Sequence, residues 1–180
     1  YTYDYSPYGN DGTIYGASFV DGKAGQAMEF DGEDDYVDCG NDESLDITKE
    51  LTVMAWVKTT STKKQAIFSK YRQSWAYLMN GKIVFEESWN WKWAYTSSVY
   101  PYDNQWHHIA ISFVDPNIIH IYLDGQEKSL EYNDFNGISD ERPWYNLIIG
   151  AWRDSEVYHV FNGLIDEVRI YNRALSEEEI

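Results

Sequence analysis

The chain has 180 residues with a net charge of −16, and 17% of its residues are aromatic. This length favours a single domain with a hydrophobic core, and the hydrophobic share of 43% argues against disorder. The negative charge repels phosphate backbones and anionic lipid, so we expect no nucleic-acid partner. No apolar run approaches the roughly 20 residues that a membrane-spanning helix needs, so we expect no membrane insertion. Residues 1–180 are predicted to be one domain taken from a larger protein.

The predicted elements are short strands rich in Val, Ile, Tyr, Phe and Trp, separated by Gly, Asn and Asp. In chain order, the longer ones are residues 51–58, 75–79, 82–87, 106–114, 118–123, 147–150 and 161–171. Asn80-Gly81 and Asp124-Gly125 accept the positive φ of type I′ turns, so each predicts a hairpin. The pattern indicates an all-β, antiparallel fold.

The first hairpin predicts which aromatic side chains face outward. Its two-residue loop places three pairs on one face, namely Met79 with Lys82, Tyr77 with Val84 and Trp75 with Glu86. The other face is apolar and predicts the core: Ala76, Leu78, Ile83 and Phe85. We therefore predict an outward ligand-binding surface made by Trp75, Tyr77, Lys82 and Glu86. Aromatic rings stack on the apolar faces of sugars, and charged groups bond sugar hydroxyls.

Five further residues extend this prediction. Trp89, Trp91 and Trp93 occupy alternate positions after the second strand of the hairpin. An unbroken strand would place them in the core, whereas a loop would expose at least one indole. Both alternatives stay open for Trp91 and Trp93. Trp152 and Arg153 lie in a loop-like stretch, and we add them, with Trp89 and Trp91, to the candidate ligand contacts.

The last predicted strand breaks strict alternation, because Ile165 and Val168 are three residues apart. A β-bulge at Asp166-Glu167 would bring both side chains to one face. Asp166 lies inside an apolar run, where a carboxylate needs a cation or hydrogen-bond donors. It is therefore the first candidate metal ligand.

Seven short segments, in order along almost the whole chain, resemble the laminin-G-like family of the concanavalin A-like lectin/glucanase superfamily. They are residues 8–13 (YGNDGT), 25–32 (GQAMEFDG), 34–37 (DDYV), 51–57 (LTVMAWV), 106–110 (WHHIA), 122–125 (YLDG) and 163–175. The resemblance implies a two-sheet antiparallel jelly-roll β-sandwich. It also implies a structural calcium ion held by Asp4, the Gly32 carbonyl and Asp166, which are oxygen ligands of the kind that calcium prefers.

Other acidic residues and the single cysteine receive structural interpretations. Four carboxylates are interpreted as solvated surface groups: Asp31, Asp34, Asp35 and Asp38. Some glycoside hydrolases of the superfamily use carboxylates on one strand, but the candidates at positions 29, 31 and 33 run into a predicted turn. Cys39 can form no internal disulfide and is predicted to be buried. No metalloprotease, triad or phosphate-loop pattern is present in the sequence, so we expect no catalysis.

The sequence thus predicts a non-catalytic, calcium-stabilised carbohydrate-binding module. The negative charge favours neutral polysaccharide or oligosaccharide as the partner. An extracellular protein-binding or adhesion module is the first alternative. An architectural domain that packs against a catalytic neighbour is the second. We expect an extracellular or cell-surface location.

Overall fold

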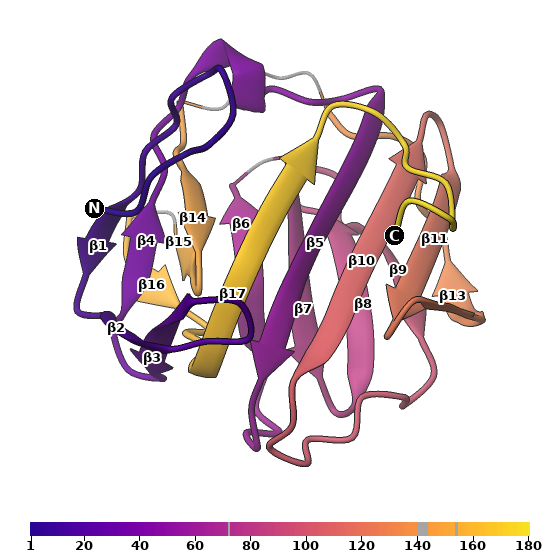
Figure 1. The fold of residues 1–180 in the computed structure, drawn as a ribbon. Coiled ribbons are helices and arrows are strands. Elements are labelled where there is room, and N and C mark those ends of the chain that lie inside the picture. Colours follow the sequence, from indigo (N-terminus) through magenta and orange to yellow (C-terminus); the bar gives the residue numbers. More distant parts are fainter. Residues whose placement is uncertain (72, 140–143, 154) are drawn as a thin grey trace.

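The computed structural model describes residues 1–71, 73–139, 144–153 and 155–180. Two antiparallel sheets pack face to face and form a sandwich (Figure 1). Within the described residues the regular helical structure is one 3₁₀ turn, η1 (Glu43–Leu45). None of these residues forms a helix with the length and apolar character needed to cross a bilayer.

The larger sheet has eight strands in the order β1-β4-β14-β6-β7-β8-β9-β13. Their bounds are β1 (Thr13–Tyr15), β4 (Tyr36–Asp38), β14 (Leu147–Ile149), β6 (Gln65–Lys70), β7 (Ser74–Met79), β8 (Lys82–Glu87), β9 (Lys92–Thr96) and β13 (Leu130–Asn133). A short ribbon of β15 (Trp152–Arg153) and β16 (Val157–Tyr158) lies beside β6.

The smaller sheet has seven strands in the order β12-β11-β10-β5-β17-β3-β2. Their bounds are β12 (Gln126–Lys128), β11 (Ile118–Leu123), β10 (His107–Val114), β5 (Glu50–Lys58), β17 (Asn162–Tyr171), β3 (Gln26–Asp31) and β2 (Ser18–Asp21). The strands predicted from the sequence agree with these bounds to within one residue at each end.

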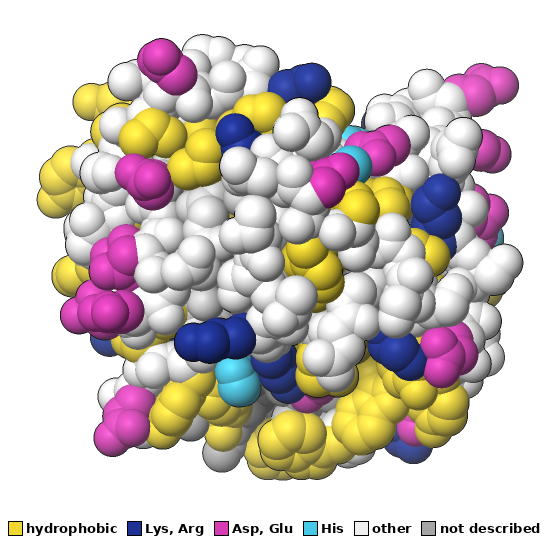
Figure 2. Space-filling view, turned by 90° about the horizontal axis from the view of Figure 1, so that it is seen from below, with side chains coloured by type: hydrophobic (Ala, Val, Ile, Leu, Met, Phe, Trp, Pro, Cys, Tyr) yellow, Lys and Arg dark blue, Asp and Glu magenta, His cyan; other side chains and the backbone are white. Residues whose placement is uncertain are grey.

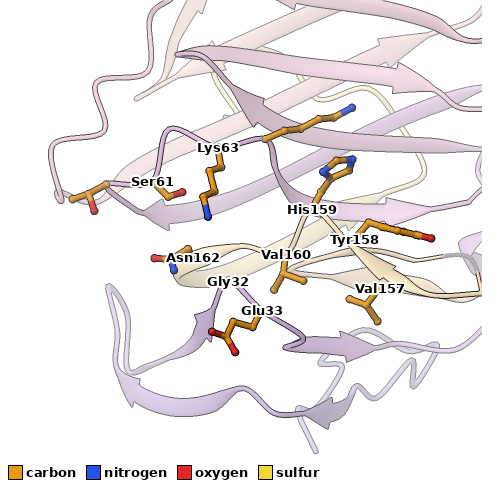
Figure 3. A pocket seen from close by; sticks show the side chains of 11 residues that line it. Gly32, Glu33, Ser61, Lys63, Val157, Tyr158, His159, Val160 and Asn162 are labelled. Atoms are coloured by element: carbon orange, nitrogen blue, oxygen red, sulfur yellow. The ribbon is translucent and has the colours of Figure 1, made fainter.

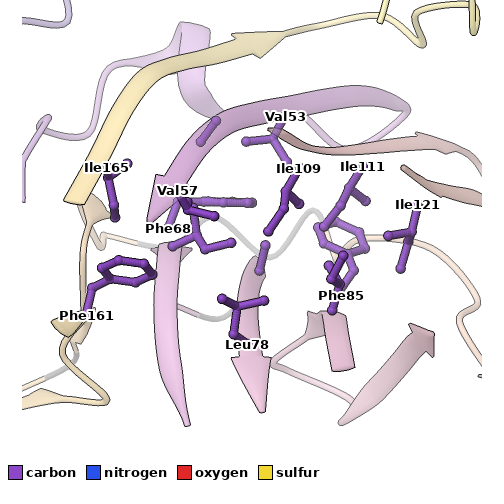
Figure 4. Packing of buried hydrophobic residues seen from close by; sticks show 14 of the residues in the cluster. Val53, Val57, Phe68, Leu78, Phe85, Ile109, Ile111, Ile121, Phe161 and Ile165 are labelled. Atoms are coloured by element: carbon purple, nitrogen blue, oxygen red, sulfur yellow. The ribbon is translucent and has the colours of Figure 1, made fainter. Parts of the chain in front are cut away.

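Alternate residues of the two sheets meet in one hydrophobic core (Figure 4). Val53 and Val57 of β5 and Ile111 of β10 point toward Leu78 and Phe85 of the opposite sheet. Since side chains alternate between the faces of a strand, a core between two sheets requires apolar residues at every second position. The predicted fold class and inner face of the hairpin are confirmed.

Cys39 is buried, as predicted, and burial raises the pKa of its thiol to about 12.

Both predicted hairpins and the predicted bulge are present. Asn80 and Gly81 have φ of 52° and 78°, and Asp124 and Gly125 have φ of 54° and 72°. In β17 the pairing with β5 shifts between Asp166 and Arg169, and Glu167 has φ of 50°. The extra residue in β17 allows Ile165 and Val168, which are three residues apart, to pack on the same face of the sheet.

Candidate functional site

A second hydrophobic cluster lies on the outer face of the larger sheet, away from the core. Its buried members are Ala66, Trp75, Tyr77 and Val84, and Met79, Trp93, Tyr95 and Trp152 pack against them. We call the five rings of this cluster the aromatic face: Trp75, Tyr77, Trp93, Tyr95 and Trp152. The outer face of an antiparallel sheet is commonly polar, so large rings there indicate a binding surface.

The rings form two rows across the strands. Trp75 pairs with Glu86, which pairs with Trp93, and in the next row Tyr77 and Tyr95 lie on either side of Val84. Neighbouring strands are about 4.8 Å apart, so each row spans about 10 Å from β7 to β9. The rings of Trp75 and Tyr77 stack with centroids 4.0 Å apart.

The register predicted for Trp75, Tyr77 and Glu86 is confirmed, but their predicted exposure is wrong. Their exposed fractions are only 3%, 4% and 3%. The Lys64 ammonium lies 4.2 Å from the ring centroids of both Trp75 and Tyr77. The ring of His159 also stacks on Trp75, with centroids 5.9 Å apart. Side chains from outside the hairpin therefore cover its inner rings and leave Trp93, Tyr95 and Trp152 partly exposed.

Glu86 is held beneath these rings by a hydrogen bond. The Tyr77 hydroxyl donates to Glu86 Oε2 at 2.9 Å. Burial, and secondarily the negative charge of Glu86, raise the pKa of Tyr77 well above its ordinary value. The phenol therefore remains a donor at neutral pH and orients the carboxylate.

Lys82, Trp152 and Arg153 have different surroundings. The Lys82 ammonium lies 4.2 Å from the Tyr95 ring centroid and pairs with Glu131 Oε1 at 2.9 Å. Trp152 belongs to the aromatic face. Arg153 pairs with Asp38 at 3.2 Å and lies over Tyr36, because adjacent residues of a strand point to opposite sides. The structure thus keeps Lys82 and Trp152 at this surface and separates Arg153 from it.

The three remaining tryptophans of the prediction, Trp89, Trp91 and Trp93, have different environments because residues 88–91 form a turn. Trp89 and Trp91 lie in this turn and are 39% and 64% exposed, as the loop alternative predicted. The Glu87 carboxylate accepts hydrogen bonds from the backbone N–H groups of Trp89 and Asn90 and so holds the turn. After the turn, Trp93 pairs with Glu86 and joins the aromatic face.

Sequence reasoning missed a pocket of about 540 Å³ beside the aromatic face. It opens at the end of the sandwich where β5 ends and β6 and β17 begin (Figure 3). Its walls include Gly32, Lys63, Lys64, Tyr158, His159 and Asn162. Lys64 and His159 also cover the Trp75 ring, so the pocket and the aromatic face are contiguous. The sequence feature that could have indicated this pocket is the pair of adjacent lysines, Lys63 and Lys64, in an otherwise acidic chain.

Buried hydrogen bonds fix the pocket walls. The fully buried Gln65 amide donates to the Ser61 carbonyl at 2.7 Å and accepts from the Asn162 N–H at 3.0 Å. Gly32 has φ of 83°, and a Cβ there would lie 2.6 Å from Asn162 Nδ2. Glycine is therefore required at this wall, and the loop before β6 is tied to the start of β17.

The predicted calcium ligands do not form one site. The Asp4 carboxylate accepts hydrogen bonds from Ser6 and Asn10 within its own loop. Asp166 accepts from the N–H groups of Ala24 and Glu167. Gly32 packs against Asn162, four residues before Asp166 on β17, a separation of about 13 Å along the strand. The bulge does redirect Asp166, but toward the turn between β2 and β3.

A different carboxylate group meets in the loop between β3 and β4. Within the described residues, ligand atoms of Asp31, Asp34 and Asp35 all lie within 4.8 Å of one another. Asp35 is buried, and burial together with the charges of Asp31 and Asp34 raises its pKa. The prediction of solvated carboxylates is wrong for Asp35, and Asp38 is also not free in solvent because it accepts hydrogen bonds from Arg153 and Asn146.

Comparison with known protein families agrees with this architecture. The family model Laminin_G_3, described as concanavalin A-like lectin/glucanases superfamily, matches residues 31–180. The chain belongs to this family. The resemblance predicted from the seven segments is thereby confirmed, and so is the jelly-roll sandwich. No curated protein matches the chain in sequence.

Solved structures of similar fold include domain 4 of AbnA, a GH43 extracellular arabinanase from Geobacillus stearothermophilus, in complex with arabinotriose. It is 24% identical, with a TM-score of 0.71 over 94% of this chain and 85% of that one. The binding domain of Paraclostridial Mosquitocidal Protein 1 is 18% identical, with a TM-score of 0.73. The alignment covers 98% of this chain but only 47% of that one. At these identities the likeness shows the fold.

Proposed function

We propose that this domain is a non-catalytic carbohydrate-binding module that holds an oligosaccharide against the aromatic face. The observation that carries the proposal is the cluster of large rings on the outer face of the larger sheet. Trp93, Tyr95 and Trp152 are the accessible rings, while Trp75 and Tyr77 support them from within. The similar arabinanase domain in complex with arabinotriose supports the choice of a saccharide ligand.

The charge of the domain favours a mainly neutral polysaccharide, because a net charge of −16 repels polyanions. Lys82 lies at the edge of the aromatic face, where its ammonium can donate to sugar hydroxyls. Polysaccharide as the ligand implies an extracellular or cell-surface location and a place beside other domains of a longer chain.

We also propose a structural calcium ion, in the loop between β3 and β4. Asp31, Asp34 and Asp35 supply three carboxylates whose mutual repulsion a divalent cation would offset, and calcium completes its shell with carbonyl or water oxygens. The ion would stiffen the loop that contributes Gly32 to the pocket wall. The role proposed for the ion is structural, and the ion takes no part in a chemical reaction.

A panel of soluble neutral oligosaccharides tests the proposed function. Binding should change the tryptophan fluorescence, and Trp93→Ala should weaken binding by about fivefold to a hundredfold. This range takes the loss of one stacking ring as about 1–3 kcal/mol, the value for bases stacked on aromatic side chains. The matched control is Trp144→Ala, since Trp144 is 89% exposed and outside the aromatic face. No response across the panel, or equal losses in both variants, would refute the proposal.

The alternative is a protein-binding module. The N-terminal segment exposes more than half of each of four tyrosines: Tyr1, Tyr3, Tyr5 and Tyr8. Tyrosine is enriched in protein interfaces, and the similar toxin domain is a binding domain. If the ligand is a protein, or a neighbouring domain of the same chain, sugars should not change the tryptophan fluorescence. Substitutions in this N-terminal segment should then weaken binding of that protein or domain.

A further inference from the structure

We infer that the pocket beside the aromatic face binds the carboxylate of one acidic sugar unit attached to an otherwise neutral oligosaccharide. This inference rests on the proposed function and specifies its ligand class. Net charge alone predicted a neutral ligand, whereas the local charges of the pocket differ from those of the whole domain.

Among the residues that the structure describes, the two lysines of the pocket, Lys63 and Lys64, are not paired with a carboxylate, unlike four other lysines. Lys49, Lys70, Lys82 and Lys92 each pair with a carboxylate. In the part of the chain that the structure describes, no ion pair involves Lys63 or Lys64. Two adjacent ammonium groups without an ion-pair partner in the described residues thus line one pocket of a strongly acidic domain, where they would attract an anion.

Lys64 is partly withdrawn from water. Its ammonium lies over the Trp75 and Tyr77 rings, 4.2 Å from each centroid. The pKa of Lys64 is lowered, because the effect of burial exceeds the opposing effect of the negative charge of Glu86. A desolvated cation gains more from a charged hydrogen-bond acceptor than a solvated one does. A carboxylate near Lys64 would supply this acceptor.

The position of the pocket matches a substituent on a sugar chain. Figure 2 shows basic side chains and a histidine next to a band of hydrophobic side chains near the lower edge of the view. Because Lys64 and His159 belong to both the pocket and the cover of Trp75, a substituent of a sugar held on the aromatic face can reach the pocket. The walls are tied together by Gln65 and Asn162, so a ligand need not order them.

One acidic side chain on the pocket wall limits the ligand to few charges. Glu33 lines the wall that faces Lys63 (Figure 3). A single carboxylate can sit by the lysines at a distance from Glu33, whereas a run of uronic acids would also meet the acidic surface of the domain. The inferred ligand class is therefore a neutral backbone with isolated uronic acid branches.

The test compares matched oligosaccharides by isothermal titration calorimetry. The probes are neutral xylo-, gluco- and galacto-oligosaccharides, the same backbones with one uronic acid substituent, and the substituted forms after reduction of the carboxyl group to an alcohol. The uronate form of at least one backbone should bind about tenfold more tightly than its reduced form at low salt, which is the size of one good charge-assisted contact. The gain should shrink as the salt concentration rises.

Variants assign the gain to the pocket. Lys63→Gln removes one of the two cations and should weaken the preference for the uronate, while leaving affinity for the neutral backbone unchanged. Lys128→Gln removes the same charge from β12, outside the pocket, and should preserve the preference. Glu33→Gln should strengthen it. Equal affinity for uronate and reduced forms with every backbone, or equal losses in the two lysine variants, would overturn the inference and leave the proposed function standing. Absence of binding by every probe would refute both.

Discussion

The Lys64 ammonium lies 4.2 Å from the centroid of the Trp75 ring and just as far from that of Tyr77. A cation from the loop before β6 thus occupies the solvent side of two rings that belong to β7. This relationship explains why an outward-facing tryptophan is almost completely buried, and it connects the aromatic face to the pocket.

Removing the cation should expose the ring. We expect Lys64→Ala to lower the free energy of unfolding by about 1 kcal/mol, the usual size of a partly solvated cation–π contact. Acrylamide should quench the tryptophan fluorescence more strongly than in the unmodified protein. Lys63→Ala, one residue away, should change neither quantity, and equal quenching in the two variants would show that Lys64 does not cover Trp75.

Removing the donor to Glu86 should destabilise the domain. Tyr77→Phe leaves a buried carboxylate without its hydroxyl partner, and we expect a loss of about 1–3 kcal/mol in the free energy of unfolding measured with urea. The control is Tyr5→Phe, because Tyr5 is exposed and its hydroxyl makes no such bond to any residue that the structure describes. A Tyr77→Phe variant as stable as the control would mean that solvent already satisfies Glu86.

His107 should make stability depend on pH. Its Nδ1 lies 2.8 Å from Asp124 and its Nε2 lies 3.1 Å from Asp103. Burial alone would lower the pKa of His107, but hydrogen bonds and charges of the two carboxylates outweigh it, so the pKa is raised above 6.5. The stabilisation is fully present below the ordinary histidine pKa of about 6.5 and is lost as pH rises through the higher pKa of His107 in the folded protein.

The measurement is urea unfolding of the unmodified protein and of His107→Gln. The stability difference between them should be larger near pH 5.5 than near pH 8.5, since the first value lies below the ordinary histidine pKa of about 6.5 and the second well above it. A difference that is constant, or that grows with pH, would contradict the assignment.

Calcium removal should destabilise the loop between β3 and β4. We expect EDTA to lower the melting temperature, and calcium to restore it, because the ion offsets repulsion among Asp31, Asp34 and Asp35. Asp34→Asn should abolish this response, whereas Asp4→Asn should keep it. The same melting curve with EDTA and with saturating calcium would remove calcium from the account.

The sequence predicted the features that depend on neighbours along the chain. Alternation and turn residues placed Trp75 and Glu86 on the outer face, and the broken alternation near Asp166 predicted the bulge. The position of Trp93 was not predictable, because the turn at residues 88–91 decides which face follows it.

Features assembled from distant segments were beyond sequence reasoning. Whether Trp75 is covered depends on Lys64 and His159, which reach it from other elements. The distant partner of Asp166, Ala24, comes from the turn before β3, and the pocket joins three separate loops. Neither periodicity nor motif spacing contains these contacts, so the candidate calcium ligands and the pocket required the structure.

The most direct test of the aromatic face is an NMR titration that follows the indole N–H signals with an oligosaccharide that binds. The signals of Trp93 and Trp152 should shift in proportion to saturation, that of Trp75 should respond through its covered ring, and that of Trp144 should stay in place. Shifts confined to Trp89, Trp91 or Trp144, with Trp93 and Trp152 unchanged, would contradict binding at this surface.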